Sequence, residues 1–122
     1  MISFSAIQKK EIMTGNFEPS RIYDLKEMVD YASGSTVSKI IIRNEKGNLT
    51  LFAFDKGQNL SEHTAPFDAI VQVLDGTGTI IIDGKQHKVQ EGQVIIMPAS
   101  VPHALEATER FKMLLIMIKA AD

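Results

Sequence analysis

The sequence contains no cysteine and no tryptophan among its 122 residues. Without cysteine the chain has no disulfide framework and no thiolate to serve as a nucleophile or metal ligand. A net charge of -2 offers no basic surface to nucleic acid or to anionic lipid. No apolar run approaches the roughly 18–20 residues that a membrane-spanning helix needs. These absences argue against thiol chemistry, nucleic-acid binding and membrane insertion.

The ends and the size of the chain set three further expectations. The first residues lack the long apolar stretch behind a basic start that marks a signal peptide, so we expect a cytoplasmic protein. The length suits one domain with a small core. The β-branched stretch from Val37 to Ile42 and the methionine-rich C-terminal stretch leave apolar faces that a small sandwich cannot cover alone. We therefore expect a homodimer.

The residues before Thr36 contain the only pattern typical of a helix. Apolar side chains recur there at helical spacing, Ser20 stands where it would cap the first turn, and Gly34 would end the helix. The apolar residues concerned are Ile22, Leu25, Met28 and Val29. We interpret residues 1–35 as an N-terminal extension, with a short helix or a single turn, that packs on a barrel formed by residues 36–122.

From Thr36 onward, short apolar stretches alternate with turn signals, as is typical of a sandwich or barrel. Asp83-Gly84 is a strong signal for a tight hairpin, and residues 75–78 also read as a turn. The predicted strands span residues 37–42, 49–54, 69–74, 79–82, 86–89, 94–97 and 111–118.

Two segments carry a resemblance to a known family. The first runs from Gly57 through His63 to Gly76, and the second from Gly92 through His103 to Ala107. Their spacing is similar to that of the two signature motifs of the cupin superfamily. The resemblance, closest to stand-alone bacterial cupins with an HTAPFDA-like first motif, implies an all-β fold. That fold is a double-stranded β-helix, or jelly-roll barrel, here with a short N-terminal helical segment.

The resemblance also implies where a metal would bind. Metal-binding cupins hold one metal with two histidines and a glutamate from the first motif and a histidine from the second. His63 and His103 match, but Ala65 stands at the second histidine and Ala69 at the glutamate. Two further motif positions differ: Ser100 replaces a glycine and Ala107 replaces an asparagine.

Side chains two apart on a strand share a face, so the interior is expected to hold two imidazoles in an apolar cup. Gln72 has the wrong parity for the interior unless a bulge turns it inward. The methionines Met97, Met113 and Met117 are expected to fill space in the cavity. The candidate ligand-binding residues are His63, Ala65, Ala69, Val71, Gln72, Met97 and His103.

Two functions from different classes are compatible with these residues. The first is a cupin that binds a compact small molecule carrying a carboxylate, phenol or carbonyl near the two histidines. The alternative is a metal-dependent enzyme, such as a small dioxygenase or isomerase, with His63 and His103 as its metal ligands. The nearby acids, Glu62, Asp68 and Glu106, give no ligand of the right parity. We therefore expect either no cofactor or one weakly held divalent metal, and the sequence leaves open whether any reaction is catalysed.

Overall fold

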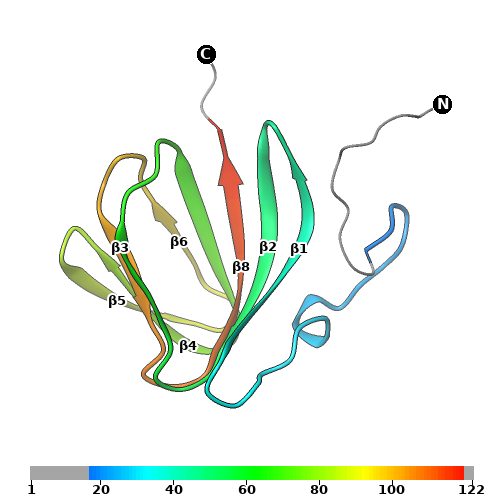
Figure 1. Cartoon of the computed structure of the whole chain (residues 1–122), viewed down its shortest axis with the longest axis horizontal. Coiled ribbons are helices and arrows are strands. Elements are labelled where there is room, and N and C mark those ends of the chain that lie inside the picture. Colours follow the sequence, from blue (N-terminus) through cyan, green and yellow to red (C-terminus); the bar gives the residue numbers. More distant parts are fainter. Residues whose placement is uncertain (1–16, 120–122) are drawn as a thin grey trace.

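A computed structural model describes residues 17–119, which form a curled antiparallel sheet, so the all-β barrel expectation is confirmed (Figure 1). Among the described residues, the single helical element is the 3-10 turn η1 (Leu25–Glu27). The strands are β1 (Thr36–Asn44), β2 (Gly47–Phe54), β3 (Asn59–His63), β4 (Asp68–Ile82), β5 (Lys85–Gln90), β6 (Val94–Met97), β7 (His103–Glu106) and β8 (Phe111–Ile118).

The sheet has two halves that share the long strand β4. The first part of β4 lies between β6 and β8, and β8 continues to β2 and β1. The second part of β4 lies between β5 and β7, and β7 continues to β3. In Figure 1 the two halves diverge upward from the lower part of β4 and enclose the interior between them.

The sequence predicted a turn at residues 75–78, and that prediction is wrong. β4 runs through these residues, with an irregular register between Val73 and Asp75. A bulge bends a strand without ending it. A side chain on Gly78 would overlap the ring of Phe111, with its Cβ placed 2.6 Å from Phe111 Cε2. The glycines here therefore let β4 bend against β8, where the sequence pattern suggested a chain reversal.

Alternation along the strands places one set of side chains inside the barrel and the other outside. Ala69, Val71 and Val73 of β4 belong to the inner core together with Phe54 and Phe111. The rings of Phe54 and Phe111 are stacked, with centroids 4.8 Å apart. The inner core thus fills the barrel near the bend of β4 and leaves its other end to the candidate site.

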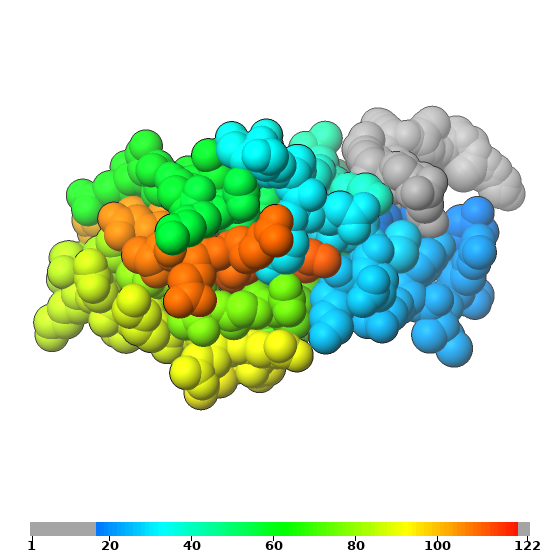
Figure 2. All heavy atoms as spheres, turned by 90° about the horizontal axis from the view of Figure 1, so that it is seen from below, coloured from blue at the N-terminus to red at the C-terminus, as the bar shows by residue number. Residues whose placement is uncertain are grey.

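A second apolar cluster lies on the outer face of the sheet. Leu51 and Ala53 of β2 and Leu114 of β8 point outward there, and the N-terminal residues 17–31 cover them. These residues, blue to cyan in Figure 2, gather at one side of the molecule. Tyr31 fixes this segment by donating from its hydroxyl to Asp75 Oδ2 at 2.6 Å.

Within the described residues, the expected N-terminal helix is present only as the 3-10 turn η1, and residues 1–16 of the predicted extension lie outside them. Ile22, which the helical pattern required on the buried face, is 99% exposed. Ser20 has a φ of 66°, and no side chain caps the turn. Helices of this length are marginal without packing along one face, and the segment instead packs on the outer face of the sheet through Leu25, Met28 and Val29.

The hairpin predicted at Asp83-Gly84 is confirmed. Ile82 of β4 pairs with Lys85 of β5, and both turn residues have positive φ, at 51° and 80°. Two positive φ values are the requirement of a type I′ turn, for which Asp-Gly is favoured. Within residues 17–119, no helix is both long and apolar enough to cross a bilayer.

Candidate functional site

Two histidines face each other across neighbouring strands. His63 ends β3 and His103 begins β7, and the two are paired in register. Their Nε2 atoms lie 3.2 Å apart, and their rings are inclined at 70° with centroids 4.4 Å apart. His103 is 5% exposed, whereas His63 is an exposed residue. The two rings are therefore close enough for one atom to contact both, and binding of a shared ligand stays a prediction.

The histidine pair lines a cavity of about 80 Å³ inside the barrel, named the cup below. Apart from the two imidazoles, every lining side chain is a hydrocarbon or a thioether. The lining residues are Leu60, His63, Ala69, Met97, His103, Leu105, Met113, Leu115 and Met117. The cup is far smaller than the roughly 300–1,000 Å³ of pockets for drug-sized ligands, so only a small group or an ion fits inside it.

Hydrogen bonds to the backbone determine which ring nitrogens carry hydrogen. His63 Nδ1 lies 2.8 Å from the Ser61 carbonyl oxygen, and His103 Nδ1 lies 3.2 Å from that of Val101. A carbonyl oxygen only accepts, so each Nδ1 carries the hydrogen and donates it. In the neutral rings both Nε2 atoms then present lone pairs to each other. The pair is therefore arranged to share one proton, one donor group or one cation.

Burial lowers the pKa of His103. Removal from water disfavours the imidazolium, and the nearby charge of His63 acts in the same direction, while the bond to the Val101 carbonyl opposes both. Among the residues lining the cup, only the two histidines have ionisable side chains. His103 thus favours its neutral form, which is the form that binds a metal or accepts a hydrogen bond.

Methionine residues flank the position where metal-binding cupins carry their glutamate. Ala69 of β4 pairs with Met97 of β6 on one side and with Met117 of β8 on the other. Directly opposed residues of antiparallel strands have Cβ atoms only about 4.5–5.5 Å apart. Met113, two residues before Leu115 on β8, shares the inward face. Of the lining residues outside the predicted set, Met113 and Met117 carry a sequence signal, since they alternate inward along the last strand.

Three predicted site residues lie away from the cup. Val71 is fully buried in the core below it and does not line it. Ala65 lies in the loop after β3, where its carbonyl oxygen accepts from the Ser100 amide at 2.7 Å. Gln72 pairs with Leu114, which belongs to the outer cluster. The irregular register of β4 comes after Gln72, between Val73 and Asp75, so no bulge turns Gln72 inward.

None of the carboxylates within residues 17–119 lines the cup. Asp68 begins β4 and points to the outer face, where its Oδ1 accepts from the Ala99 amide at 2.9 Å. Glu62 and Glu106 are exposed. Across residues 17–119 there is no group of three or more histidine, cysteine, aspartate or glutamate side chains that could hold a metal ion. The ligand set of metal-binding cupins is therefore not completed by other acids or histidines of the described chain.

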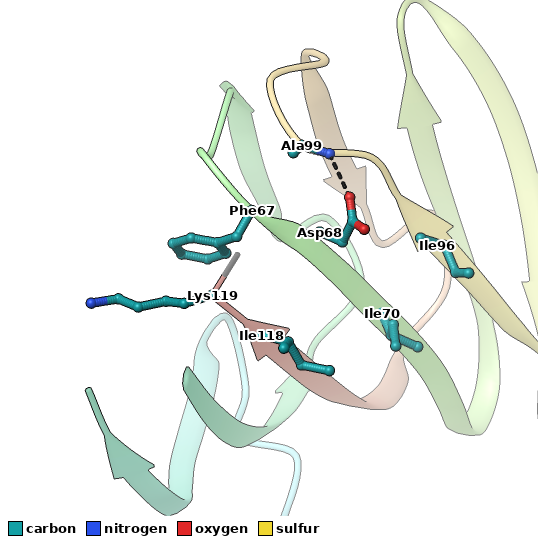
Figure 3. Close-up of a pocket in the computed structure, with 7 residues that line it drawn as sticks. All are labelled: Phe67, Asp68, Ile70, Ile96, Ala99, Ile118 and Lys119. Atoms are coloured by element: carbon teal, nitrogen blue, oxygen red, sulfur yellow. Dashed lines mark hydrogen bonds between the residues drawn. The ribbon is translucent and has the colours of Figure 1, made fainter. Parts of the chain in front are cut away.

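A larger hollow of about 290 Å³ lies on the outer face of the sheet, outside the barrel (Figure 3). Its wall is mostly apolar, with one acidic and one basic side chain. The residues lining it are Phe67, Asp68, Ile70, Ile96, Ala99, Ile118 and Lys119. It shares no lining residue with the cup, so the two hollows are separate features.

The comparisons with known proteins agree with this architecture. The family model described as "Cupin domain" matches residues 50–119, which is more than half of the chain. An uncharacterized protein of Aquifex aeolicus (strain VF5) is 30% identical over 101 residues, covering 81% of this chain and 84% of that protein. Its description assigns it no activity.

Solved structures give the same result. A conserved protein of unknown function from Streptococcus pyogenes is 38% identical with a TM-score of 0.83, covering 88% of this chain and 95% of that one. A cupin 2 conserved barrel domain protein from Leptotrichia buccalis is 46% identical with a TM-score of 0.78. That match covers 80% of this chain and 47% of the other, so this chain spans about half of that protein.

Proposed function

We propose, from the premise that the chain belongs to the cupin domain family, that it binds a compact small molecule at His63 and His103. Cupin barrels host many functions, so the proposal depends on the site and not on the fold. The observation that carries it is the convergence of two Nε2 atoms 3.2 Å apart, with both Nδ1 atoms committed to carbonyl oxygens.

The chemistry of the pair defines the ligand class. Two neutral rings present two acceptors to an acidic O–H, such as that of a phenol or a carboxylic acid. When the pair holds one proton it is a cation and suits a carboxylate. The small volume of the cup admits only a few atoms, and the exposed ring of His63 leaves the rest of the ligand at the mouth. The proposed function is binding, without a catalysed reaction.

Imidazole NMR tests this proposal, with phenol and acetate as probes. Long-range proton–nitrogen spectra of labelled protein should show His63 and His103 shifting together with one half-saturation concentration. His87, a partly exposed residue of β5 that does not line the cup, serves as internal control. Binding should survive His87→Gln and be lost in the His63→Ala, His103→Ala double variant. Absence of shifts, equal shifts at all three histidines, or binding by the double variant would overturn the proposal.

A metal-dependent enzyme is the second candidate, and one observation favours it. Two nitrogens bound to a first-row metal at about 2.0–2.1 Å and a tetrahedral angle lie about 3.3 Å apart, close to the 3.2 Å seen here. Donation from Nδ1 to a carbonyl is also the usual outer contact of a metal-bound histidine. Catalytic zinc sites use three protein ligands, however, and Ala65 and Ala69 supply none. The site therefore supplies two of the four protein ligands that hold a divalent metal in metal-binding cupins.

A further inference from the structure

We infer that the cup selects a soft monovalent metal ion, Cu(I), held by His63, His103 and the thioether of Met97, with Met117 beside it. This inference rests on the proposed function in one respect, since it uses the same histidine pair. It differs in the bound species, which is a monovalent metal ion in place of an organic molecule. It also differs in the residues that give selectivity, which are methionines.

The donors that face the cup suit a soft ion. Sulfur ligands favour soft metals, Cu(I) among them, and imidazole binds copper as well. The cup contains two imidazoles and three thioethers, and no oxygen side chain lines it. Half of the six methionines of the chain line this one cavity. Met28, by contrast, packs in the outer cluster.

Strand register places two methionines beside the position where the family carries its carboxylate. Ala69 stands at the family's glutamate position, and Met97 and Met117 flank it across the two neighbouring strands. Met97 is 2% exposed, so its side chain is confined to the interior. Met117 Sδ also accepts from Asn48 Nδ2 at 3.8 Å, which holds that sulfur and leaves it a second lone pair. Met97 is therefore the principal sulfur ligand.

Charge separates a monovalent ion from a divalent one. A divalent ion between two neutral imidazoles and thioethers keeps its whole charge in an apolar surrounding, which is unfavourable without a carboxylate. The acid adjacent to Ala69 in sequence, Asp68, is directed outward by its bond to the Ala99 amide. A monovalent ion has a much smaller charge to accommodate, and the neutral donors already present suffice for it.

Competition for the metal tests the inference. Anaerobic protein kept reduced with ascorbate is titrated with Cu(I) against a coloured Cu(I) chelator, and separately with Zn(II). We expect one Cu(I) per chain, bound more tightly than Zn(II). X-ray absorption at the copper edge should show sulfur as well as nitrogen neighbours. Tighter binding of Zn(II), or a copper shell without sulfur, would overturn the inference.

Substitutions assign the sulfur ligand. Met97→Leu is close in volume, so the fold should tolerate it; unchanged thermal unfolding checks this. Loss of even an outer partner of a metal ligand weakens binding by about tenfold or more, so Met97→Leu should weaken Cu(I) binding at least as much. Met28→Leu, a change of the same kind in the outer cluster, should leave it unchanged. Equal affinities in the two variants would refute a role for Met97.

The outcomes also separate this inference from the proposed function. If His63→Ala abolishes binding of both Cu(I) and phenol while Met97→Leu affects neither, the histidine site stands and the selection of a soft ion fails. If His63→Ala affects neither probe, both proposals fail. The expected pattern is that His63→Ala weakens both probes and Met97→Leu weakens only Cu(I).

Discussion

Ser100 holds a backbone conformation that favours glycine. Its φ is 64°, and it occupies the position where the second cupin motif carries glycine. Its amide donates to the Ala65 carbonyl oxygen at 2.7 Å, so the strained residue joins the loops that follow β3 and β6. Asparagine, aspartate and glycine accept positive φ readily, whereas a β-branched residue there is a genuine outlier.

Ser100→Val should therefore destabilise the fold by about 1–2 kcal/mol, the range for an L-residue forced into the left-handed region. Ser100→Gly should change the free energy of unfolding by less than about 1 kcal/mol, because relief of strain and added freedom of the unfolded chain oppose each other. Urea unfolding of the two variants beside the natural protein measures both. A valine variant as stable as the glycine variant would contradict this account.

The lowered pKa of His103 predicts a pH dependence of stability. Below the ordinary value of about 6.5, His103 of the unfolded chain takes up a proton while the buried ring stays neutral. The unfolded state then binds more protons, so stability falls as the pH drops from 6.5 towards the folded pKa. One proton limits the slope to about 1.4 kcal/mol per pH unit.

Urea unfolding between pH 7.5 and 5 checks this expectation, with His103→Phe as the comparison. The variant lacks the titrating ring, so its stability should change less with pH than that of the natural protein. Acidic groups titrate in both proteins and cancel in the difference. Parallel curves for the two proteins would show that His103 does not carry the effect.

A substitution at Ala69 tests whether the missing carboxylate is what prevents the cup from binding a divalent metal. Ala69→Glu restores the family's carboxylate between Met97 and Met117. Without metal, overpacking and the buried carboxylate should destabilise the protein by about 1–3 kcal/mol. With Zn(II), stability should recover, since a metal that binds only the folded state stabilises it. Thermal unfolding with and without Zn(II) reports both effects, and a variant indifferent to Zn(II) would contradict them.

The histidines and Met97 were predictable because each occupies a recognisable motif position or a strand of clear alternation. The methionines of the last strand were expected to fill the cavity, but the position of Met97 and Met117 beside Ala69 was not predictable. Their approach depends on the registers of β4 with β6 and with β8, and such long-range pairing is not contained in any local stretch of sequence. Gln72 remained undecided at the sequence level because only the position of the bulge decides which way it faces.

Among the elements, hairpin turns and apolar strands followed from local sequence, whereas the path of β4 did not. Asp83-Gly84 forms a turn because both residues accept positive φ. Gly76 and Gly78 read as the same signal, yet they serve close contact with β8: a Cβ on Gly76 would lie 2.4 Å from the Arg110 carbonyl oxygen. Glycine required by packing and glycine required by a turn look alike in one sequence.

The N-terminal segment depends on a small polar cluster for its attachment. Tyr31 donates to Asp75, while Arg110 and Lys112 lie over its ring at 4.1 and 5.0 Å from the centroid. Burial raises the pKa of Tyr31, and the bond to Asp75 and the charge of that carboxylate raise it further. The phenol thus stays protonated and keeps its hydrogen for donation.

A double-mutant cycle of Tyr31→Phe and Asp75→Ala should give a coupling of about 1 kcal/mol for this partly exposed hydrogen bond. Either single change should also speed proteolysis within residues 17–35 before the barrel is cut, because the segment loses its attachment. Urea unfolding and limited proteolysis supply the two measurements. Strictly additive stabilities would rule out a direct contribution of the bond.

For the whole molecule, the homodimer stays a prediction, now with a specific surface. Val37 and Ile41, which motivated it, pack in the outer cluster covered by residues 17–31. Apolar side chains remain exposed elsewhere, at Val94 and Ile96 of edge strand β6 and at Ile118, each 55–56% exposed. The last two line the hollow in Figure 3.

We propose a second copy of the chain as the occupant of this hollow. Asp68 and Lys119 line it together, and a two-fold axis brings such opposite charges of one patch against each other. An exposed strand edge such as β6 also needs a partner or protection. One dimer contact over β6 and the hollow would protect the strand edge and also pair the opposite charges.

Size-exclusion chromatography with light scattering should give the mass of two chains for the natural protein. Ile96→Glu should give the mass of one chain, because it places a charge in the apolar centre of the contact. Ile22→Glu is the matched control, since Ile22 is 99% exposed on the N-terminal segment and should leave the dimer intact. A natural protein with the mass of a single chain at micromolar concentration would refute the prediction.

The position of β3 at the edge of its half of the sheet should limit how long a ligand stays bound to the histidine pair. β3 is bonded to β7 alone, through an irregular register, and it carries His63. His103 lies on β7, which is held on its other side by β4. Strands with few ladder bonds open locally, ahead of global unfolding. The residence time of whatever the two rings hold should therefore follow the opening rate of β3, and amide hydrogen exchange along β3 should report the same rate.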